Sequence, residues 1–207
     1  MKVIGKSTYV ITPALLDKSM TYDTYRSVVV DLLAENKATG DFMDNNSDVL
    51  HYTKMNIARM NRGDKTKHIN EELSNLVKSS KEKQIWLVIT EGWCGDAAQN
   101  IPIMVRLAAL NPLIDIKFVF RHENEELMDA YLTNNTRSIP KLVILNGHTL
   151  EELATWGPRP AVAQEITDAF KKNDSLSYDD YAKDLHKWYA KDKYQSIQNE
   201  LLEILGT

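Results

Sequence analysis

The sequence has 207 residues, a length typical of one large domain or of a small domain with extensions. Hydrophobic residues make up 43% of the chain and charged residues 26%, which are ordinary values for a globular protein. The net charge of -4 argues against a protein that binds nucleic acid or an anionic membrane through a basic surface. No apolar run approaches the roughly 18 residues of a membrane-spanning helix, and a single cysteine excludes an internal disulfide. We therefore expect a cytoplasmic protein.

Residues 1–80 show apolar side chains at helical spacing. Tyr25 and Val29 fall on one face of a predicted helix, a second helix is predicted over about 48–61, and the segment 68–80 carries a third amphipathic pattern. The N-terminal part of the chain is therefore expected to be helical.

From residue 84 onward, apolar runs of strand length alternate with helical patterns. The run at 85–90 is continuously apolar, as expected for a strand that is buried on both faces. The pair Asn146-Gly147 predicts a hairpin. Strands alternating with helices, followed by a hairpin, predict an α/β fold with a mixed sheet covered by helices. The predicted order is strand 85–90, helix 95–110, strand 114–121, helix 123–134, strand 141–145, strand 150–156 and helix 160–172.

The last predicted helix covers residues 178–205, and its apolar phase slips near 190–193, where we expect a bend or a break. The chain is thus predicted to consist of a helical N-terminal extension packed on the core (1–83), a core (84–172) and a C-terminal helical extension (173–207).

Cys94 lies between the end of a predicted strand and the start of a predicted helix. Unpaired backbone N–H groups and the helix dipole at such a position lower the pKa of a thiol from about 8.5 into the roughly 3.5–7.5 range. A lone cysteine is, on the other hand, usually a small buried apolar residue. Because Cys94 is flanked by Trp93 and Gly95 at the mouth of a helix, we favour a reactive thiol.

The stretch 93–97, WCGDA, resembles the active-site motif of the thioredoxin family, in which a tryptophan precedes a Cys-Gly-Pro-Cys turn. Pro102, eight residues after Cys94, matches the proline that kinks the helix in that family. Pro140, 46 residues after Cys94, matches the proline held in cis beside the thiol, and Gly157 matches the glycine that follows the hairpin. The full chain also resembles a group of bacterial thioredoxin-family proteins with a helical N-terminal extension. The resemblance implies a thioredoxin-like fold.

The resemblance also implies which residues form the site. Pro140 would be cis, and the backbone of Ile139 would pair with an extended partner in a groove that Gly157 borders. Trp93 would lie half exposed on the docking surface. The implied partner is a protein that carries a thiol or disulfide, or a small thiol, and no cofactor is expected.

Several positions depart from the family pattern. Ala97 replaces the resolving cysteine, so a mixed disulfide on Cys94 would need an external thiol for its release. Asp96 replaces the proline of the motif, and its negative charge should raise the pKa of the thiol. The carboxylate that the family buries before the first cysteine falls at Val88, and Glu91 nearby is expected to be a solvated loop residue.

Other candidate sites are weaker. The five histidines show no metal-ligand spacing, so no metal site is expected. The segment 52–68 is basic, and a solvated helix face is the favoured interpretation. The alternative is that Arg59 or Arg62 faces Cys94 and stabilises its thiolate or binds a carboxylate of a small thiol such as glutathione.

Two hypotheses for function follow. The first is a monothiol oxidoreductase in which Cys94 exchanges with a disulfide and an external thiol resolves the adduct. The second is a non-catalytic binding module that holds a ligand in the groove beside Pro140. The sequence predicts no oligomeric state.

Overall fold

The protein folds around a four-stranded sheet with the strand order β2-β1-β3-β4. β2 runs parallel to β1, whereas β3 is antiparallel to both β1 and β4. A mixed sheet flanked by helices confirms the predicted α/β class. The strands are β1 (Gln84–Thr90), β2 (Ile114–Phe120), β3 (Lys141–Asn146) and β4 (Glu152–Trp156). The computed structural model describes residues 10–40, 47–66, 69–173 and 175–206.

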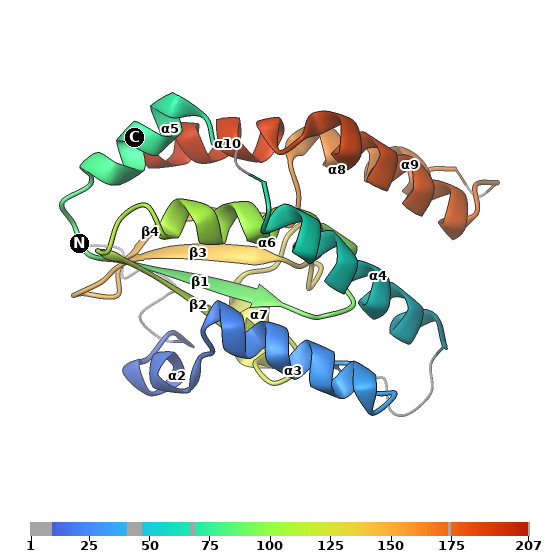
Figure 1. The fold of residues 1–207 in the computed structure, drawn as a ribbon, viewed down its shortest axis with the longest axis horizontal. Helices are drawn as coiled ribbons and strands as arrows, with labels where there is room; N and C mark the ends of the chain where they lie inside the picture. The colour runs from blue at the N-terminus through green and yellow to red at the C-terminus, as the bar shows by residue number, and fades with distance from the viewer. Residues whose placement is uncertain (1–9, 41–46, 67–68, 174, 207) are drawn as a thin grey trace.

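Helices cover both faces of this sheet. In Figure 1, α6 and α4 lie on one side of the strands, and α2 and α3 lie on the other. The helices of the described residues are α2 (Pro13–Lys18), α3 (Tyr22–Ala34), α4 (Ser47–Gly63), α5 (Glu71–Ser79), α6 (Gly95–Ala108), α7 (Glu125–Ala130), α8 (Ala161–Lys171), α9 (Tyr178–Asp192) and α10 (Gln195–Leu205).

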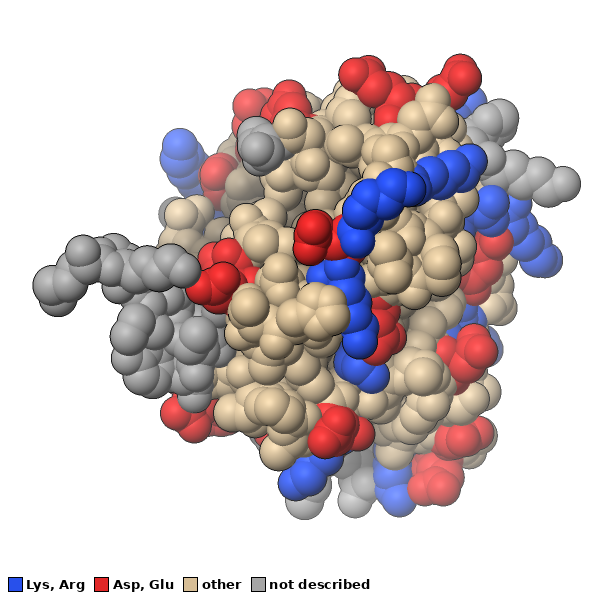
Figure 2. Space-filling model, turned by 90° about the vertical axis from the view of Figure 1, so that its left-hand side faces the viewer, with Lys and Arg blue, Asp and Glu red and all other residues tan. Residues whose placement is uncertain are grey.

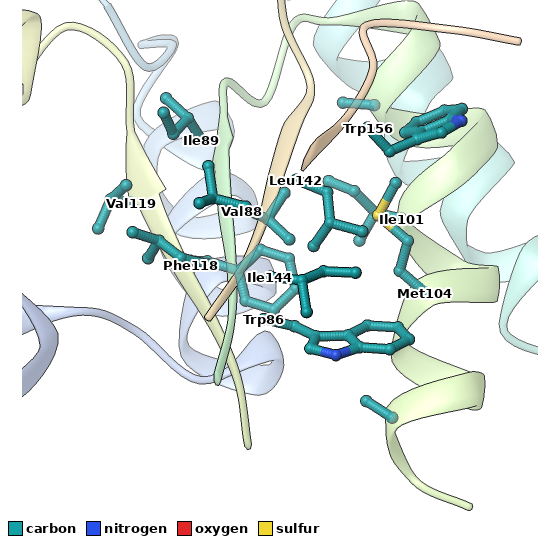
Figure 3. Packing of buried hydrophobic residues seen from close by; sticks show 14 of the residues in the cluster. Trp86, Val88, Ile89, Ile101, Met104, Phe118, Val119, Leu142, Ile144 and Trp156 are labelled. Atoms are coloured by element: carbon teal, nitrogen blue, oxygen red, sulfur yellow. The ribbon is translucent and has the colours of Figure 1, made fainter. Parts of the chain in front are cut away.

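The central strand is buried as its apolar run predicts. Every residue of β1 after Gln84 is buried. Trp86 packs with Ile101 and Met104 of α6 in the core between strand and helix (Figure 3), and all three side chains are almost fully buried. On α3, the ring of Tyr25 stacks on that of Phe118, with 5.4 Å between the centroids.

The predicted extensions contribute to the same core. Leu73 of α5 and Leu201 of α10 belong to the buried cluster that surrounds β1. A second buried cluster joins α8 to α9 and consists of Ala163, Tyr181, Leu185 and Tyr189. Helix α10 therefore packs on the sheet domain, and α9 packs on α8.

The predicted break in the last helix is confirmed. Lys193 and Tyr194 both adopt left-handed backbone conformations, with φ of 49° and 67°, and they separate α9 from α10. Two consecutive left-handed residues cannot continue a right-handed helix, so α9 and α10 are distinct helices.

The surface carries no single dominant charge on the face that Figure 2 shows. Lysine and arginine side chains are interspersed with aspartate and glutamate on this face. Among the described residues, no helix is long and apolar enough to cross a membrane.

The packing between α6 and the sheet gives a stability prediction. Because Ile101 is fully buried, the substitution Ile101→Ala removes apolar contacts and leaves a cavity, which should lower the free energy of unfolding by about 2–5 kcal/mol. The control Leu153→Ala, at a side chain that is 51% exposed, should change it by less than about 0.5 kcal/mol. Urea denaturation of the two variants measures both values, and equal losses would contradict the packing described for α6.

Candidate functional site

Cys94 is the N-cap residue of α6, at the end of the turn that follows β1. The backbone N–H of Ala97 donates to its Sγ at 3.4 Å, and the thiol donates to the carbonyl of Ile139 at 3.2 Å. The sulfur thus lies between the first turn of α6 and the segment that leads into β3.

The turn before Cys94 is fixed by the N-terminal part of the chain. The backbone N–H of Gly92 donates to the hydroxyl of Thr39 at 2.9 Å, and its carbonyl accepts from the amide of Asn56 at 3.3 Å. A Cβ on Gly92 would lie 2.8 Å from a methyl group of Val29. Helices α3 and α4 therefore help to shape the turn that holds the thiol.

The predicted groove residues lie close to one another, and of these Ile139 contacts the sulfur through its carbonyl. The Ile139–Pro140 peptide bond is cis, as the family resemblance implies. Gly157 has a φ of +114°, and a Cβ there would collide with the carbonyl of Pro140. A second cis bond, Gly157–Pro158, has no counterpart in the sequence prediction.

The thiol is buried, and this overturns the expected pKa. Cys94 is only 7% exposed. Burial and, to a lesser extent, the carboxylate of Asp96 raise the pKa of Cys94 to about 12, although the Ala97 N–H and the charge of Arg159 act in the opposite direction. The prediction of a lowered thiol pKa is therefore wrong, because loss of hydration outweighs the helix N-terminus.

Asp96 is the centre of a buried hydrogen-bond network. Its Oδ2 accepts from Nε and Nη2 of Arg159 at 3.0 and 2.6 Å, and its Oδ1 accepts from the hydroxyl of Tyr189 at 2.6 Å. The amide of Asn100 donates to the same tyrosine oxygen at 3.0 Å. One carboxylate thus connects α6 with α9 and with the segment before α8.

The network extends from Arg159 to both C-terminal helices. Nη1 of Arg159 donates to the hydroxyl of Thr167 on α8 at 2.8 Å. That hydroxyl lies 2.9 Å from the hydroxyl of Tyr181 on α9. The sequence analysis did not identify Arg159 or Tyr189 as site residues. The one signal available for Arg159 was its position in the Gly-Pro-Arg-Pro stretch that follows the hairpin.

Helix α9 also covers the start of α6. A Cβ on Gly95 would lie 2.9 Å from the ring of His186, and the side-chain amide of Gln99 lies 3.2 Å from Nδ1 of the same histidine. Burial and, to a lesser extent, the nearby charge of Arg59 lower the pKa of His186 to about 4. His186 is therefore neutral at physiological pH.

A pocket of about 390 Å³ opens over Cys94. Its walls come from the turn 93–96, from the segment 133–139, and from α8 and α9. Trp93 is half-buried at its rim, with the guanidinium of Arg121 5.0 Å above the ring. A molecule bound in this pocket would meet the sulfur and the cis-proline segment together.

Arg59 and Arg62, which the alternative hypothesis named as anion contacts, lie in different places. Nη1 of Arg59 is 3.9 Å from the position of a Cβ on Gly95, and it donates to the side chain of Asn56 at 2.6 Å. Arg62 is exposed and lines neither the pocket over Cys94 nor its neighbour beside α4. The arginine whose charge acts on the thiol is Arg159, which comes from the other half of the chain.

Glu91 is buried, so its prediction as a solvated loop residue is wrong. Its side chain is fully inaccessible, and Oε1 accepts from the backbone N–H of His122 at 2.9 Å and lies 2.9 Å from that residue's Nδ1. Val88 is buried within β1. Among the described residues, no group of three or more His, Cys, Asp or Glu side chains is placed to hold a metal ion.

Comparisons with known proteins agree with the observed fold. A family model described as Thioredoxin matches residues 42–171, a range that begins inside the predicted N-terminal extension. A crystal structure of a protein of unknown function from Pseudomonas aeruginosa superposes with a TM-score of 0.57 at 16% identity, over 94% of this chain and 97% of that one. An HIV epitope-scaffold superposes with a TM-score of 0.52 at 16% identity, over 86% and 96%. At these identities the likeness concerns the fold alone. No curated protein matches the sequence.

The Asp96 network yields a prediction with two readouts. Asp96→Asn should lower the free energy of unfolding by on the order of 3–5 kcal/mol, because it leaves the buried guanidinium of Arg159 without its counter-charge. It should also lower the pKa of Cys94, because a negative charge beside the sulfur is removed. Urea denaturation and alkylation rate against pH measure the two effects.

The matched control is Asp129→Asn, which breaks an exposed ion pair with Arg137. This variant should lose much less stability than Asp96→Asn, and its thiol titration should equal that of the wild type. Unchanged stability together with an unchanged thiol titration in Asp96→Asn would contradict the role assigned to the network.

Proposed function

We propose that this chain, which belongs to the thioredoxin family, performs monothiol thiol–disulfide exchange through Cys94. The observation that carries the proposal is the position of the sulfur. It lies at the N-cap of α6, beside the carbonyl that precedes cis-Pro140, and it lines a pocket of about 390 Å³. A disulfide bound in that pocket is within reach of the thiol.

The exchange would proceed in two displacements. The thiolate of Cys94 attacks one sulfur of a disulfide R–S–S–R′, the S–S bond breaks, and R′–S⁻ leaves and takes up a proton. Because Ala97 stands where a second thiol would resolve the adduct, an external thiolate attacks the sulfur of R. Cys94 then departs as a thiolate, and R is carried away in a new disulfide. The scheme needs a supply of thiols, as in the reducing cytoplasm of a cell.

The raised pKa of Cys94 limits the rate of this reaction. With the thiol pKa near 12, nearly all Cys94 is protonated at neutral pH, and the thiol form is a poor nucleophile. We therefore expect slow exchange at neutral pH that accelerates as the pH rises. In this scheme residues 84–172 form the core of the site, and 1–83 and 173–207 are extensions that shape it.

The second candidate is a non-catalytic binding module, and the buried, protonated thiol favours it. In this case the pocket beside Ile139 and Pro140 holds a ligand, and Cys94 serves as part of its wall. The partner would be a small thiol or a thiol-bearing protein in the first case and any fitting ligand in the second.

The proposal predicts a pH-dependent adduct on Cys94. Incubation with the neutral 2-hydroxyethyl disulfide should give a mixed disulfide whose rate of formation rises with pH up to about 12, because the thiolate is the attacking species. Mass spectrometry of the intact protein measures the adduct, and Cys94→Ser should form none.

The same experiment separates the two candidates. Exchange would be excluded as the function if the folded protein forms no adduct at any pH at which it stays folded, although the urea-unfolded protein does form one. If a ligand then binds equally to wild type and to Cys94→Ser, the binding module is the better account.

A further inference from the structure

The pocket over Cys94 is lined by an excess of positive charge. Four cationic side chains line it, against the single carboxylate of Asp96. The chain as a whole has a net charge of -4, so this excess does not follow from composition. The cationic residues are Arg121, Arg137, Arg159 and Lys171.

Two of the four cations are already neutralised. Arg159 is paired with Asp96, with 2.6 Å between Nη2 and Oδ2. Arg137 is paired with Asp129 at 2.6 Å and with Glu125 at 3.3 Å. Arg121 and Lys171 have no ion-pair partner among the described residues, so their charges are available to a ligand.

Arg121 is held in place without being neutralised. Its guanidinium lies over the ring of Trp93, and Nη1 donates to the carbonyl of Arg137 at 3.1 Å. A guanidinium has five N–H donors, and a fixed one can offer the others to a carboxylate in a paired arrangement. Lys171, at the end of α8, is exposed and brings a second positive charge to the same pocket.

The dimensions favour a small molecule over a folded partner. A volume of about 390 Å³ lies within the roughly 300–1,000 Å³ of small-molecule sites. The contacts of His186 and Tyr189 with the start of α6 keep α9 over the turn. A protein chain would have to displace α9 before it reached the sulfur, whereas a small molecule would not.

We propose that this pocket binds a small carboxylate-bearing molecule, with its acidic group on Arg121 and Lys171 and the remainder directed toward Cys94. The inference deepens the proposed function, because a disulfide carrying such a group would be the preferred exchange partner. Binding itself needs no reaction at the sulfur, so it can be tested separately.

The first test measures binding without the thiol. Succinate is titrated into Cys94→Ser, and the affinity is followed by calorimetry. Replacing both cations, in Cys94→Ser/Arg121→Gln/Lys171→Gln, should weaken succinate binding by about tenfold or more, because two charge-assisted contacts are lost. Lys187→Gln, at an exposed lysine of α9 outside the pocket, is the matched control and should bind like its parent. Equal affinity in the doubly substituted pocket, or no saturable binding of succinate to Cys94→Ser, would overturn the proposal.

The second test measures selectivity in exchange. The anionic dithiodiglycolate should form an adduct with the wild type faster than the cationic cystamine, and this preference should be lost in Arg121→Gln/Lys171→Gln. Unchanged urea midpoints show that these variants remain folded. Adducts that form equally fast from both disulfides overturn the anion site and leave thiol exchange standing. Succinate binding without any adduct would support the anion site and argue against thiol exchange.

Discussion

The ion pair between Asp96 and Arg159 is the contact on which the rest of the site depends. A buried carboxylate is costly unless its charge is compensated and its oxygens are hydrogen-bonded. Here two nitrogens of Arg159 and the hydroxyl of Tyr189 supply three donors to it. Because these donors come from the segment before α8 and from α9, satisfying the carboxylate requires the C-terminal helices to lie against α6. Asp96 therefore helps to hold α9 against α6, together with the apolar cluster that packs α9 on α8.

The same arrangement determines the state of the sulfur. A helix N-terminus stabilises a nearby anion by roughly 0.3–2 kcal/mol. A shift of the thiol pKa from 9 to about 12 corresponds to about 4 kcal/mol in the opposite direction. Burial and the negative charge of Asp96 both act against the thiolate, and together they outweigh the backbone N–H groups at the start of α6 and the charge of Arg159. An exposed cysteine at a helix N-cap is activated by the helix N-terminus. Cys94 occupies such a position but is buried, and it is therefore protonated.

Local patterns made much of the fold predictable. The continuous apolar run of β1, the Asn146-Gly147 hairpin and the loss of helical phase near Lys193 each depend on neighbours close in sequence. The family resemblance of Pro140 also predicted the cis bond that precedes β3. What the sequence could not show were contacts between distant residues: the pairing of Asp96 with Arg159, 63 positions away, and the burial of Glu91 against His122. Glu91 was expected to be solvated because nothing in its local sequence identifies His122 as its partner.

Access to the sulfur and its acidity are coupled by this geometry. A movement of the whole of α9 away from α6 would separate Tyr189 from Asp96 and His186 from Gly95. That movement would also admit water to Cys94, and hydration favours the charged form of a thiol. A ligand that enters by displacing α9 would therefore meet a more acidic thiol than the closed structure holds. A ligand small enough to enter beneath α9 would meet the protonated form, so the size of the bound molecule determines how readily Cys94 reacts.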